Sequence, residues 1–549
     1  MPRIVNLAHE QSTHQPATLP HLREVLASVM KQSGSIQSVS AAPLKRGGEL
    51  LFFRRLLLVL LVFRLVYGGL LQLVPDEAYY WVWSRHLAMG YFDHPPMIAY
   101  VIWAGTHLLH STELGVRFGI ILMSIGAMGI IVSLGKRILR DSRATVWLAI
   151  LWLTSPLLMA LGTICTPDTP AMFFSVCALY FVTLIADRDD AAADSDSPGL
   201  WILFGIFSGL ALLSKYTGVL LPAAVAVAML TSPRGRAHYR RPWIYLSGLL
   251  TLAVFSPVIV WNKQHGWASF LFQLHHGTMD HAALAPRTAA EIVLRFFKDL
   301  GTYVGDQSLV WTPVLFLLAI VVLWHFWRRY RTVSQVDRLL LWCGTVPLVF
   351  FGMAAVQAHH TEANWPAFSY FPVSLLTVRW LSETWSDLRL NWVRLGVNIA
   401  LVVLIVMHVI SVPKITREIV EKQVHIPHAF ADLLGWREYG TWLGTQSDLA
   451  GGAMVVTNKH QDAGEAAFYM PGQPEVWCSS LGTRPTAFDY FDEHPDFAKM
   501  PRVVWVGGNA NLFSKQYGYD VLVRSDLTVL PRSKNARTFV ALVLGKSQR

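Results

Sequence analysis

Short polar segments interrupt this otherwise apolar chain, and the first of them carries residues that could do chemistry. It lies at residues 75–96, reads PDEAYYWVWSRHLAMGYFDHPP, and begins with the adjacent carboxylates Asp76 and Glu77. A carboxylate placed beside an attacking hydroxyl can remove its proton. The segment ends on Asp93 and His94, two side chains of the kinds that bind a divalent cation. The sequence therefore offers a base and, further along the same segment, a candidate metal pair.

Three more polar segments carry groups suited to an anionic substrate. TPDTP contains Asp168, LLSKYTG contains Lys215, and HHTEANWP contains His359, His360 and Glu362. Either a lysine or a cation held by carboxylate and histidine can stabilise a departing phosphate, so both possibilities stay open. The chain has no serine elbow, P-loop or HExxH motif, which disfavours hydrolase and ATPase functions. We expect no nucleotide and no organic cofactor.

Each of these residues also has an ordinary structural explanation. Asp76 and Asp168 stand at the start of apparent helices, where a carboxylate commonly caps the helix N-terminus. Tyr79 and Tyr80 are typical of the aromatic belt at a membrane surface, and Lys215 could extend from a helix end toward water. Only a convergence of the polar segments at one place would favour catalysis over these explanations.

Composition places the chain in a membrane. Of the 549 residues, 53% are hydrophobic and 15% are charged, whereas soluble globular proteins carry roughly 25% charged residues. Long apolar runs recur along the sequence, which is typical of a polytopic membrane protein. The formal net charge of +10 reflects membrane topology rather than nucleic-acid binding, because the basic residues gather in particular connecting segments.

The basic residues indicate which segments face the cytoplasm. Lys and Arg fill the connections at 136–143, 234–241 and 328–338 but are absent from 163–169 and 357–364. Because cytoplasmic loops are enriched in Lys and Arg, the first three are cytoplasmic and the last two face the opposite side. The N-terminal flank is basic too, so the first polar segment emerges outside. All four polar segments thereby fall on the outer face, where a substrate with a lipid tail and a polar head could meet them.

Counting the crossings predicts the fold class. The run at 97–109 is shorter than the roughly 20 residues of a membrane span and follows two prolines, so we expect an interfacial or re-entrant helix there. The second crossing is then 115–134. The prediction is a mainly α-helical, polytopic membrane protein with about 11–13 transmembrane helices and interfacial helices in the first outer loop.

Arg64 stands apart from the other polar residues because it lies in the middle of the first predicted span. A charge at that depth in a membrane is costly. We therefore expect Arg64 either to have a buried partner or to contact a lipid headgroup.

The C-terminal part of the chain differs from its middle. Residues 453–458 and 503–508 resemble short strands, and 459–470 resembles a helix. They predict a small α/β domain outside the membrane. Its Gly507-Gly508 lacks the spacing of a dinucleotide-binding fingerprint. The predicted parts are a polar cytoplasmic tail, a transmembrane catalytic domain and this α/β domain, at 1–48, 49–412 and 413–549.

The motifs resemble those of a known group of membrane enzymes. DEAYYWVWSRHL…GYFDHPP, TPDTP, LLSKYTG and EANWPA, in this order between residues 50 and 412, resemble the bacterial branch of the polyprenyl-phosphate-sugar-dependent GT-C glycosyltransferases. That group includes protein O-mannosyltransferase relatives and the aminoarabinose transferases that modify lipid A. The resemblance implies a GT-C fold and an inverting transfer of a sugar from a polyprenyl-phosphate donor to a hydroxyl of a lipid, glycan or protein acceptor. It also implies an active site and a C-terminal domain on the periplasmic side of the bacterial inner membrane, among membrane lipids and without nucleic acid.

The resemblance further implies roles for individual residues. Asp76 matches the base or acceptor-orienting carboxylate of the family's first outer loop, with Glu77 as its partner, and Asp168 matches the acidic residue of the second outer loop. Lys215 matches a lysine that contacts the lipid phosphate. The candidate contacts to the substrate and its lipid phosphate are Lys215, Arg64, Tyr79, Tyr80, His94, His359, His360 and Glu362.

The sequence departs from the aminoarabinose transferases at two motifs. They carry Phe-Glu-Lys-Pro-Pro where this chain has FDHPP, so Asp93 and His94 are the candidate metal ligands here. HHTEANWP replaces a Lys-x-His pattern, which leaves His359 and His360 as candidates in that loop. A divalent metal ion is thus an open expectation, and the motifs fix neither the sugar nor the acceptor.

Two other kinds of function remain as alternatives. A flippase or transporter of a lipid-linked sugar should show inverted repeats and polar groups near the midplane of the membrane. This sequence shows no repeat, and its polar residues are expected at one face. The second alternative is a non-catalytic envelope scaffold whose C-terminal domain binds partners.

Overall fold

The computed structural model describes most of the chain. The described residues are 46–191, 197–278, 288–358, 362–422, 430, 432–508, 510–529 and 536–547. The segment Phe52–Arg549 forms one compact unit.

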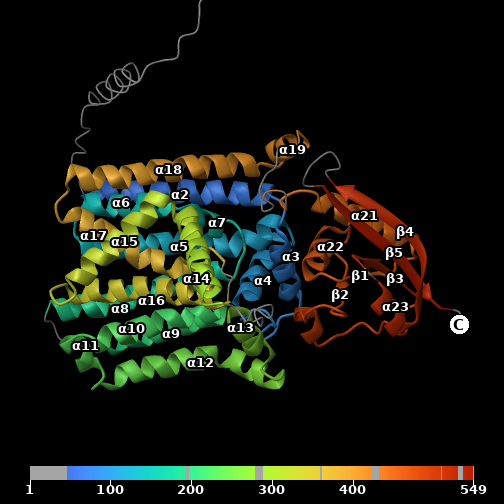
Figure 1. Ribbon diagram of the computed structural model, residues 1–549, viewed down its shortest axis with the longest axis horizontal. Helices are drawn as coiled ribbons and strands as arrows, with labels where there is room; N and C mark the ends of the chain where they lie inside the picture. Colours follow the sequence, from blue (N-terminus) through green and yellow to red (C-terminus); the bar gives the residue numbers. More distant parts are fainter. Residues whose placement is uncertain are drawn as a thin grey trace, which may run out of the picture. The chain divides into compact units, whose positions relative to one another are not determined.

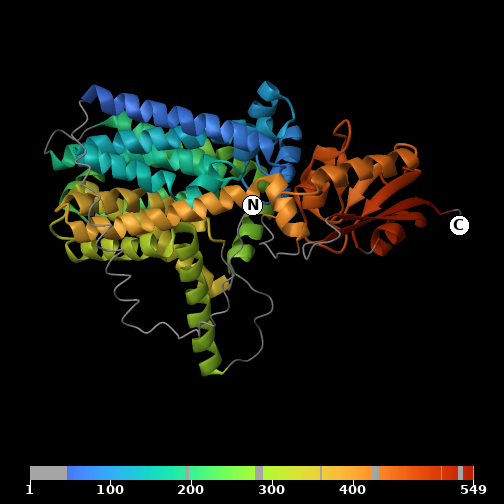
Figure 2. The same ribbon diagram turned by 90° about the horizontal axis from the view of Figure 1, so that it is seen from above.

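Long apolar helices lie side by side and form a bundle (Figures 1 and 2). Among the described residues, five helices are long and apolar enough to cross a membrane, or up to seven if each of two bent helix pairs is one span. The five are α5 (Glu113–Leu139), α8 (Asp168–Asp190), α12 (Pro242–Gln264), α16 (Gln335–Ala358) and α18 (Asp387–Ser411). The bent pairs are α2 (Arg46–Leu70) with α3 (Pro75–Arg85), and α14 (Ala289–Trp311) with α15 (Pro313–Arg328). The prediction of a mainly α-helical, multi-pass membrane protein is confirmed.

Shorter helices complete this part of the chain. They are α4 (Met97–Leu109), α6 (Ser142–Leu153), α7 (Pro156–Leu161), α9 (Pro198–Ser214), η1 (Tyr216–Val219), α10 (Leu220–Leu230), α11 (Pro233–His238), α13 (Ala268–Thr278), η3 (Trp365–Ser369), α17 (Tyr370–Ser382) and α19 (Pro413–Glu421). The run at 97–109 forms α4, which has 13 residues and is too short for an ordinary span, as expected. The predicted number of 11–13 spans stays a prediction.

Glycines let neighbouring helices of the bundle approach closely. Between α9 and α12, a Cβ on Gly205 would lie 2.4 Å from the carbonyl oxygen of Ser247. The Thr251 hydroxyl donates a hydrogen bond to the Gly205 carbonyl at 3.0 Å. Between α4 and α5, a Cβ on Gly105 would lie 2.2 Å from the carbonyl oxygen of Gly115. Small residues are therefore required at these crossings, as is common in membrane helices, which gain stability from close backbone packing.

The first polar segment begins where the chain turns by 92° from α2 into α3. Pro75 is the first residue of α3, a position that needs no backbone N–H. The helix is capped by Glu77, whose Oε2 accepts a hydrogen bond from the Val74 backbone N–H at 3.0 Å. Neither Asp76 nor Asp168 is the N-cap residue of its helix. The capping explanation of these two aspartates is therefore wrong, and their carboxylates have other surroundings.

A five-stranded mixed sheet forms in the C-terminal region, in the order β2-β1-β3-β5-β4. The strands are β1 (Met454–Thr457), β2 (Val476–Cys478), β3 (Arg502–Val506), β4 (Tyr519–Val529) and β5 (Arg537–Lys546). β1, β2 and β3 are parallel, and β5 runs antiparallel to both β3 and β4. The helices of this region are α21 (Trp436–Leu449), α22 (His460–Tyr469), η4 (Ala487–Tyr490) and α23 (Asn511–Tyr517). The strands predicted at 453–458 and 503–508 and the helix predicted at 459–470 are confirmed as β1, β3 and α22.

The first polar segment packs directly against this C-terminal region. A Cβ on Gly464 of α22 would lie 2.6 Å from the backbone nitrogen of Tyr79 in α3, so the two helices touch at the backbone. Beside this contact, the rings of Trp81 and Phe468 meet edge to face with centroids 5.0 Å apart. Side chains from both elements belong to one hydrophobic core. α3 thus lies between the bundle and the loops of the sheet (Figure 1).

Candidate active site

Glu77 is at the centre of a buried polar network. Its Oε1 accepts hydrogen bonds from Arg117 Nε at 2.8 Å and from the Cys165 backbone N–H at 2.6 Å. Its Oε2 accepts from Arg117 Nη2 and from the Val74 backbone N–H. Neither Glu77 nor Arg117 is exposed to solvent. With four donors on its two oxygens, Glu77 has no obvious room to accept a substrate proton, and it positions the chain instead of acting beside Asp76.

Arg117 extends this network to the end of α2. Its guanidinium donates to the carbonyl oxygens of Gly68 at 2.6 Å, Leu71 at 2.8 Å and Gln72 at 2.9 Å. These are carbonyls at and beyond the last turn of a helix, which otherwise lack partners. Glu77 also accepts a hydrogen bond from the backbone N–H of Cys165, three residues before Asp168. The Glu77–Arg117 pair therefore fixes the start of the first polar segment relative to TPDTP.

Asp76 differs from its neighbour Glu77 because its side chain is exposed to solvent. It lies in the wall of a cavity of about 1130 Å³ between α3 and the C-terminal sheet. Surrounding protein raises the pKa of the Asp76 carboxyl, and the negative charges of Asp93 and Glu362 raise it further. A hydrogen bond from Gln461 and the positive charge of Arg484 oppose this rise. A reachable carboxylate with a raised pKa is suited to accept a proton near neutral pH.

Asp168 and Lys215 form a buried ion pair. The Lys215 ammonium donates to Asp168 Oδ1 at 2.7 Å, and Asn364 Nδ2 donates to Asp168 Oδ2 at 2.9 Å. Asp168 begins α8, Lys215 follows the end of α9, and Asn364 belongs to HHTEANWP. Three of the four polar segments therefore meet at one carboxylate. Lys215 does not extend toward water, so its explanation as a snorkelling lysine is wrong.

Tyr80 joins this cluster to the first polar segment. Burial raises the pKa of the Tyr80 hydroxyl well above its usual value, and the negative charges of Asp76, Asp93 and Asp168 raise it further. Tyr80 therefore lies within electrostatic reach of carboxylates from the first polar segment and from TPDTP. The expected convergence of the polar segments is present in the structure.

Tyr79 and Asp93 connect the first polar segment to the C-terminal region. The Tyr79 hydroxyl donates to Asp93 Oδ2 at 2.7 Å and accepts from the Ala487 backbone N–H at 2.7 Å. Arg484 Nη1 donates to Asp93 Oδ1 at 2.9 Å. Both tyrosines are buried, with 2% of Tyr79 and 7% of Tyr80 exposed. They are parts of the site and not of an aromatic belt at the membrane surface.

The arrangement of Asp93 does not fit the predicted metal pair. Both of its oxygens already accept hydrogen bonds, one of them from a cation, so a metal ion would have to displace Arg484. His94 lies with its ring edge-on to Tyr80, at a centroid distance of 6.3 Å. In the part of the chain that the structure describes, no group of three or more His, Cys, Asp or Glu residues could hold a metal ion. A divalent metal ion at Asp93 and His94 stays a prediction.

Arg64 has the buried partners that its depth in the bundle predicts. Its guanidinium donates to the Ser124 hydroxyl in α5 and to the carbonyl oxygen of Leu158 in α7, the latter at 3.3 Å. A Cβ on Gly162 would overlap the guanidinium, so glycine is needed beside it. Arg64 thus joins three helices, and its predicted contact with the lipid phosphate remains untested.

The last candidates are in HHTEANWP. His359 and His360 lie outside the described residues. Glu362 is described, and its charge acts on Asp76 as given above.

The sequence did not predict Gln461 and Arg484 as residues of the site. Each contacts a carboxylate of the first polar segment from nearly 400 residues away, and no local pattern marks that proximity. The available signal was their place in the chain, because Gln461 follows β1 and Arg484 follows β2. Residues just after parallel strands are where open α/β sheets gather binding groups.

Comparisons with known proteins agree with this architecture. Residues 93–261 match the model of the family described as dolichyl-phosphate-mannose-protein mannosyltransferase. The lipid A galacturonosyltransferase RgtD of Rhizobium johnstonii is 27% identical over 319 residues, which cover 58% of this chain and 62% of that protein. The undecaprenyl phosphate-alpha-4-amino-4-deoxy-L-arabinose arabinosyl transferase of Edwardsiella ictaluri is 25% identical over 207 residues, 35% of either protein. The chain thus spans less than two thirds of the length of these curated relatives.

The fold agrees with a solved structure over nearly the whole chain. The crystal structure of ArnT from Cupriavidus metallidurans in the apo state matches with a TM-score of 0.59 at 15% identity, covering 90% of this chain and 98% of that one. The same enzyme bound to undecaprenyl phosphate matches with a TM-score of 0.56 at 16% identity, with the same coverage. The chain therefore has the fold of ArnT, in agreement with the fold expected from its motifs.

Proposed function

We propose that this protein is an inverting glycosyltransferase that moves a sugar from a polyprenyl-phosphate donor to a hydroxyl of lipid A or another envelope glycan. The observation that carries the proposal is the pairing of a reachable carboxylate, Asp76, with the buried Asp168–Lys215 pair at the same end of the bundle. Support comes from the names of two relatives. One is a lipid A galacturonosyltransferase, and the name of the other, an arabinosyl transferase, includes undecaprenyl phosphate. ArnT, which shares the fold, has been crystallised with that lipid phosphate.

In this proposal Asp76 is the general base. It takes the proton of the acceptor hydroxyl while the hydroxyl oxygen forms a bond to the anomeric carbon of the donor sugar. The bond between that carbon and the phosphate oxygen breaks on the opposite side, which inverts the anomeric configuration. The electron pair of the broken bond leaves with the lipid phosphate. Lys215 pairs with Asp168, which also accepts a hydrogen bond from Asn364, and Lys215 supplies positive charge to the leaving group.

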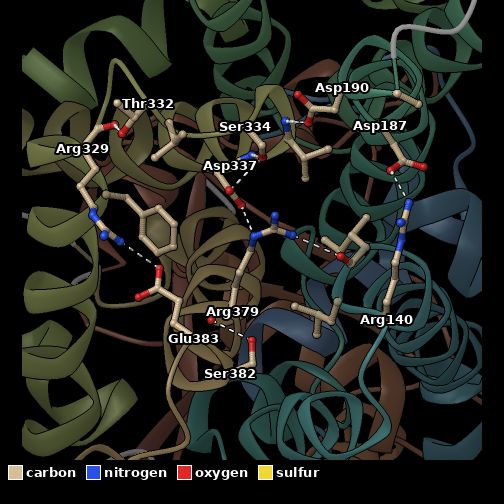
Figure 3. A pocket seen from close by; sticks show the side chains of 16 residues that line it. Arg140, Asp187, Asp190, Arg329, Thr332, Ser334, Asp337, Arg379, Ser382 and Glu383 are labelled. Carbon is tan, nitrogen blue, oxygen red and sulfur yellow. Dashed lines mark hydrogen bonds and ion pairs between the residues drawn. The ribbon is translucent and has the colours of Figure 1, made fainter.

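We further propose that this site faces the periplasm. The opposite end of the bundle carries a charged pocket of about 870 Å³, in which Arg140, Arg329 and Arg379 pair with Asp187, Glu383 and Asp337, respectively (Figure 3). α5 and α8 begin at the active site and end at this pocket. Because basic residues favour the cytoplasmic side, the pocket marks the cytoplasmic end, and the active site then faces the periplasm.

The test uses purified protein in vesicles with a polyprenyl-phosphate sugar and a lipid A acceptor. Wild-type protein should form the glycosylated acceptor, and the Asp76→Asn variant should not, although it is folded and inserted like wild type. Movement of the lipid-linked sugar across the vesicle membrane with no product would identify a flippase or transporter instead. If neither product nor movement is detected with any donor, the envelope scaffold becomes the better explanation.

A further inference from the structure

The cavity beside Asp76 lies at the carboxyl ends of three parallel strands. The chain leaves β1 through α22 and reaches β2 on one side of β1, and it later returns to form β3 on the other side. The crevice where strand order reverses in this way is the usual ligand site of an open α/β sheet. Residues that directly follow β1 and β3, together with part of the loop after β2, line the cavity. The sheet therefore presents its usual binding edge toward Asp76.

The floor of this crevice requires a glycine. Gly507, the first residue after β3, has φ of +125°, and a Cβ there would lie 2.1 Å from Asn458 Oδ1. Glycine at this position lets the Asn458 side chain lie across the ends of β1 and β3. It also leaves the backbone of Gly507 and Gly508 bare at the cavity surface. An amide and open backbone at the base of a cavity are groups that can hydrogen-bond a polar ligand.

The side chains around the cavity suit hydroxyl groups. The uncharged side chains that line it include two amides, Asn458 and Gln461, the hydroxyls of Thr483 and Thr538, and the aromatic ring of Phe539. Amides donate and accept hydrogen bonds, hydroxyls do the same, and a ring offers an apolar surface. A cavity of about 1130 Å³ is at the upper end of the range that holds small ligands. These properties fit one or two sugar rings.

The charges around the cavity are balanced, which argues against a site for phosphate alone. Arg484 is paired with Asp93, and Arg537 is paired with Asp432 at 3.2 Å. His460 adds no charge near neutral pH, because burial lowers its pKa to about 4. Asp462 lies close to Lys459, whose positive charge opposes the rise that burial causes in the pKa of Asp462. Recognition in this cavity therefore depends on hydroxyl groups more than on net charge.

Gln461 connects this crevice to the catalytic carboxylate. Both side chains line the cavity, and Gln461 opposes the rise in the pKa of Asp76 from the first turn of α22, at the carboxyl end of β1. A hydroxyl held by the sheet loops would thus reach Asp76 from the side opposite the bundle. Lys215, the candidate contact for the donor phosphate, approaches from the bundle. The two substrates can then meet at Asp76 from opposite sides.

We propose that the crevice at the ends of β1, β2 and β3 binds a saccharide unit of the acceptor, and that Gln461 positions the attacking hydroxyl at Asp76. This inference rests on the proposed glycosyltransferase function and deepens it, because it assigns acceptor recognition to the C-terminal sheet. Gln461 is a positioning residue in this scheme, and the sheet loops select the acceptor.

The experiment compares three variants in the reconstituted transfer reaction. Gln461→Ala removes the bridge to Asp76, and Thr538→Trp fills the cavity. Thr445→Trp is the matched control, because Thr445 is exposed on α21 and does not line the cavity. We expect both cavity variants to raise the KM for the acceptor at least tenfold and to leave the KM for the donor unchanged, whereas the control should behave like wild type. An acceptor KM within twofold of wild type for both cavity variants, or a rise in the donor KM instead, would overturn the inference.

A binding measurement keeps the inference separate from the transfer activity. The probe is the water-soluble saccharide released from lipid A by complete deacylation, titrated calorimetrically into detergent-solubilised protein. Wild type and Thr445→Trp should bind it, and Thr538→Trp should bind at least tenfold more weakly. The dephosphorylated saccharide should bind within threefold of the phosphorylated one. Absence of binding to wild type, or binding only when phosphates are present, would contradict the inference even if transfer activity is found. If Thr538→Trp does not fold, Gln461→Ala decides the outcome in both assays.

Discussion

Glu77 and Arg117 form a fully buried ion pair that joins the first polar segment and TPDTP to the end of α2. Glu77 binds the backbone of Val74 before α3 and of Cys165 before TPDTP. The pair therefore determines where Asp76 and Asp168 stand relative to each other. Its role is geometric, whereas the proposed chemistry belongs to Asp76, the exposed carboxylate next to it.

Removing one partner of this pair should destabilise the protein strongly. Arg117→Met leaves the Glu77 carboxylate buried without its cation, a change that typically costs about 3–5 kcal/mol. Thermal unfolding in detergent should show a large fall in Tm. The control is Arg524→Met, which breaks an exposed ion pair with Asp526 and should change stability by less than about 1 kcal/mol. Equal effects of the two variants would contradict the role given to the buried pair.

Lys215 should matter for the donor and not for the acceptor. Replacing it by Met removes the cation proposed to face the leaving phosphate, and loss of one such electrostatic group typically lowers kcat about 10²–10³-fold. Asn364→Ala removes one neutral donor to Asp168 and should have a smaller effect, about fivefold to tenfold. Steady-state kinetics at varied donor and acceptor concentrations measures both effects. A Lys215→Met enzyme with wild-type kcat would rule out this role.

The activity should fall in acid at a higher pH than an ordinary aspartate predicts. Asp76 must be ionised to accept a proton, and the folded protein raises its pKa, so the active form is lost as the pH falls through that raised value. Glu362→Gln removes one of the negative charges that raise this pKa and should shift the acid limb of the kcat/KM profile to lower pH. Asp526→Asn, far from the site in an exposed pair, should leave the profile unchanged. A shift to higher pH in Glu362→Gln would contradict the assignment.

Glu465 should make the protein less stable as the pH rises. It is buried in α22, and in the described structure neither carboxylate oxygen has a hydrogen-bond partner. Burial raises its pKa well above the usual value, with a further contribution from Glu77. As the pH rises, the unfolded chain releases this proton before the folded protein does. The free energy of unfolding is therefore unaffected by Glu465 below the ordinary glutamate pKa. Above that pKa it falls by about 1.4 kcal/mol per pH unit until the pKa of the folded protein is reached.

Glu465→Gln should therefore raise the Tm at neutral pH and flatten its pH dependence, without a comparable change near pH 4. Unfolding curves collected between pH 4 and pH 8 make this comparison. A variant less stable than wild type at pH 8 would show that the carboxylate has a role its surroundings do not reveal.

Removal of divalent metal should leave the activity unchanged. Arg484 already supplies a positive charge to Asp93 and Tyr79 hydrogen-bonds its other oxygen, so a metal ion would have to compete with both side chains there. The test is the transfer rate after treatment with EDTA and after addition of Mg²⁺, Mn²⁺ or Zn²⁺. Loss of activity that one of these ions restores would return Asp93 and His94 to the metal-binding role expected from the sequence.

Hydropathy and the distribution of Lys and Arg determined the class of this protein without the structure. Apolar runs leave a chain few alternatives to membrane helices, because backbone groups in lipid must be hydrogen-bonded within their own segment. The strands and helix at 453–470 and 503–508 were also recognised, since local periodicity reports on them directly. β4 was not predicted, because its residues are largely exposed and lack a buried alternating pattern. β5 was not predicted either, although only Thr538 among its residues is exposed.

The four polar segments were identified as candidates from the sequence, and TPDTP and LLSKYTG do meet in the Asp168–Lys215 pair. The different roles of the residues in these segments follow only from the tertiary structure. Asp76 and Glu77 are adjacent in the sequence, yet one is exposed at a cavity and the other is saturated by buried donors. Arg484 and Gln461 reach the first polar segment from the distant sheet. Burial and hydrogen-bond partners arise when separate segments pack together, so a linear sequence can name the reactive side chains but cannot assign their environments.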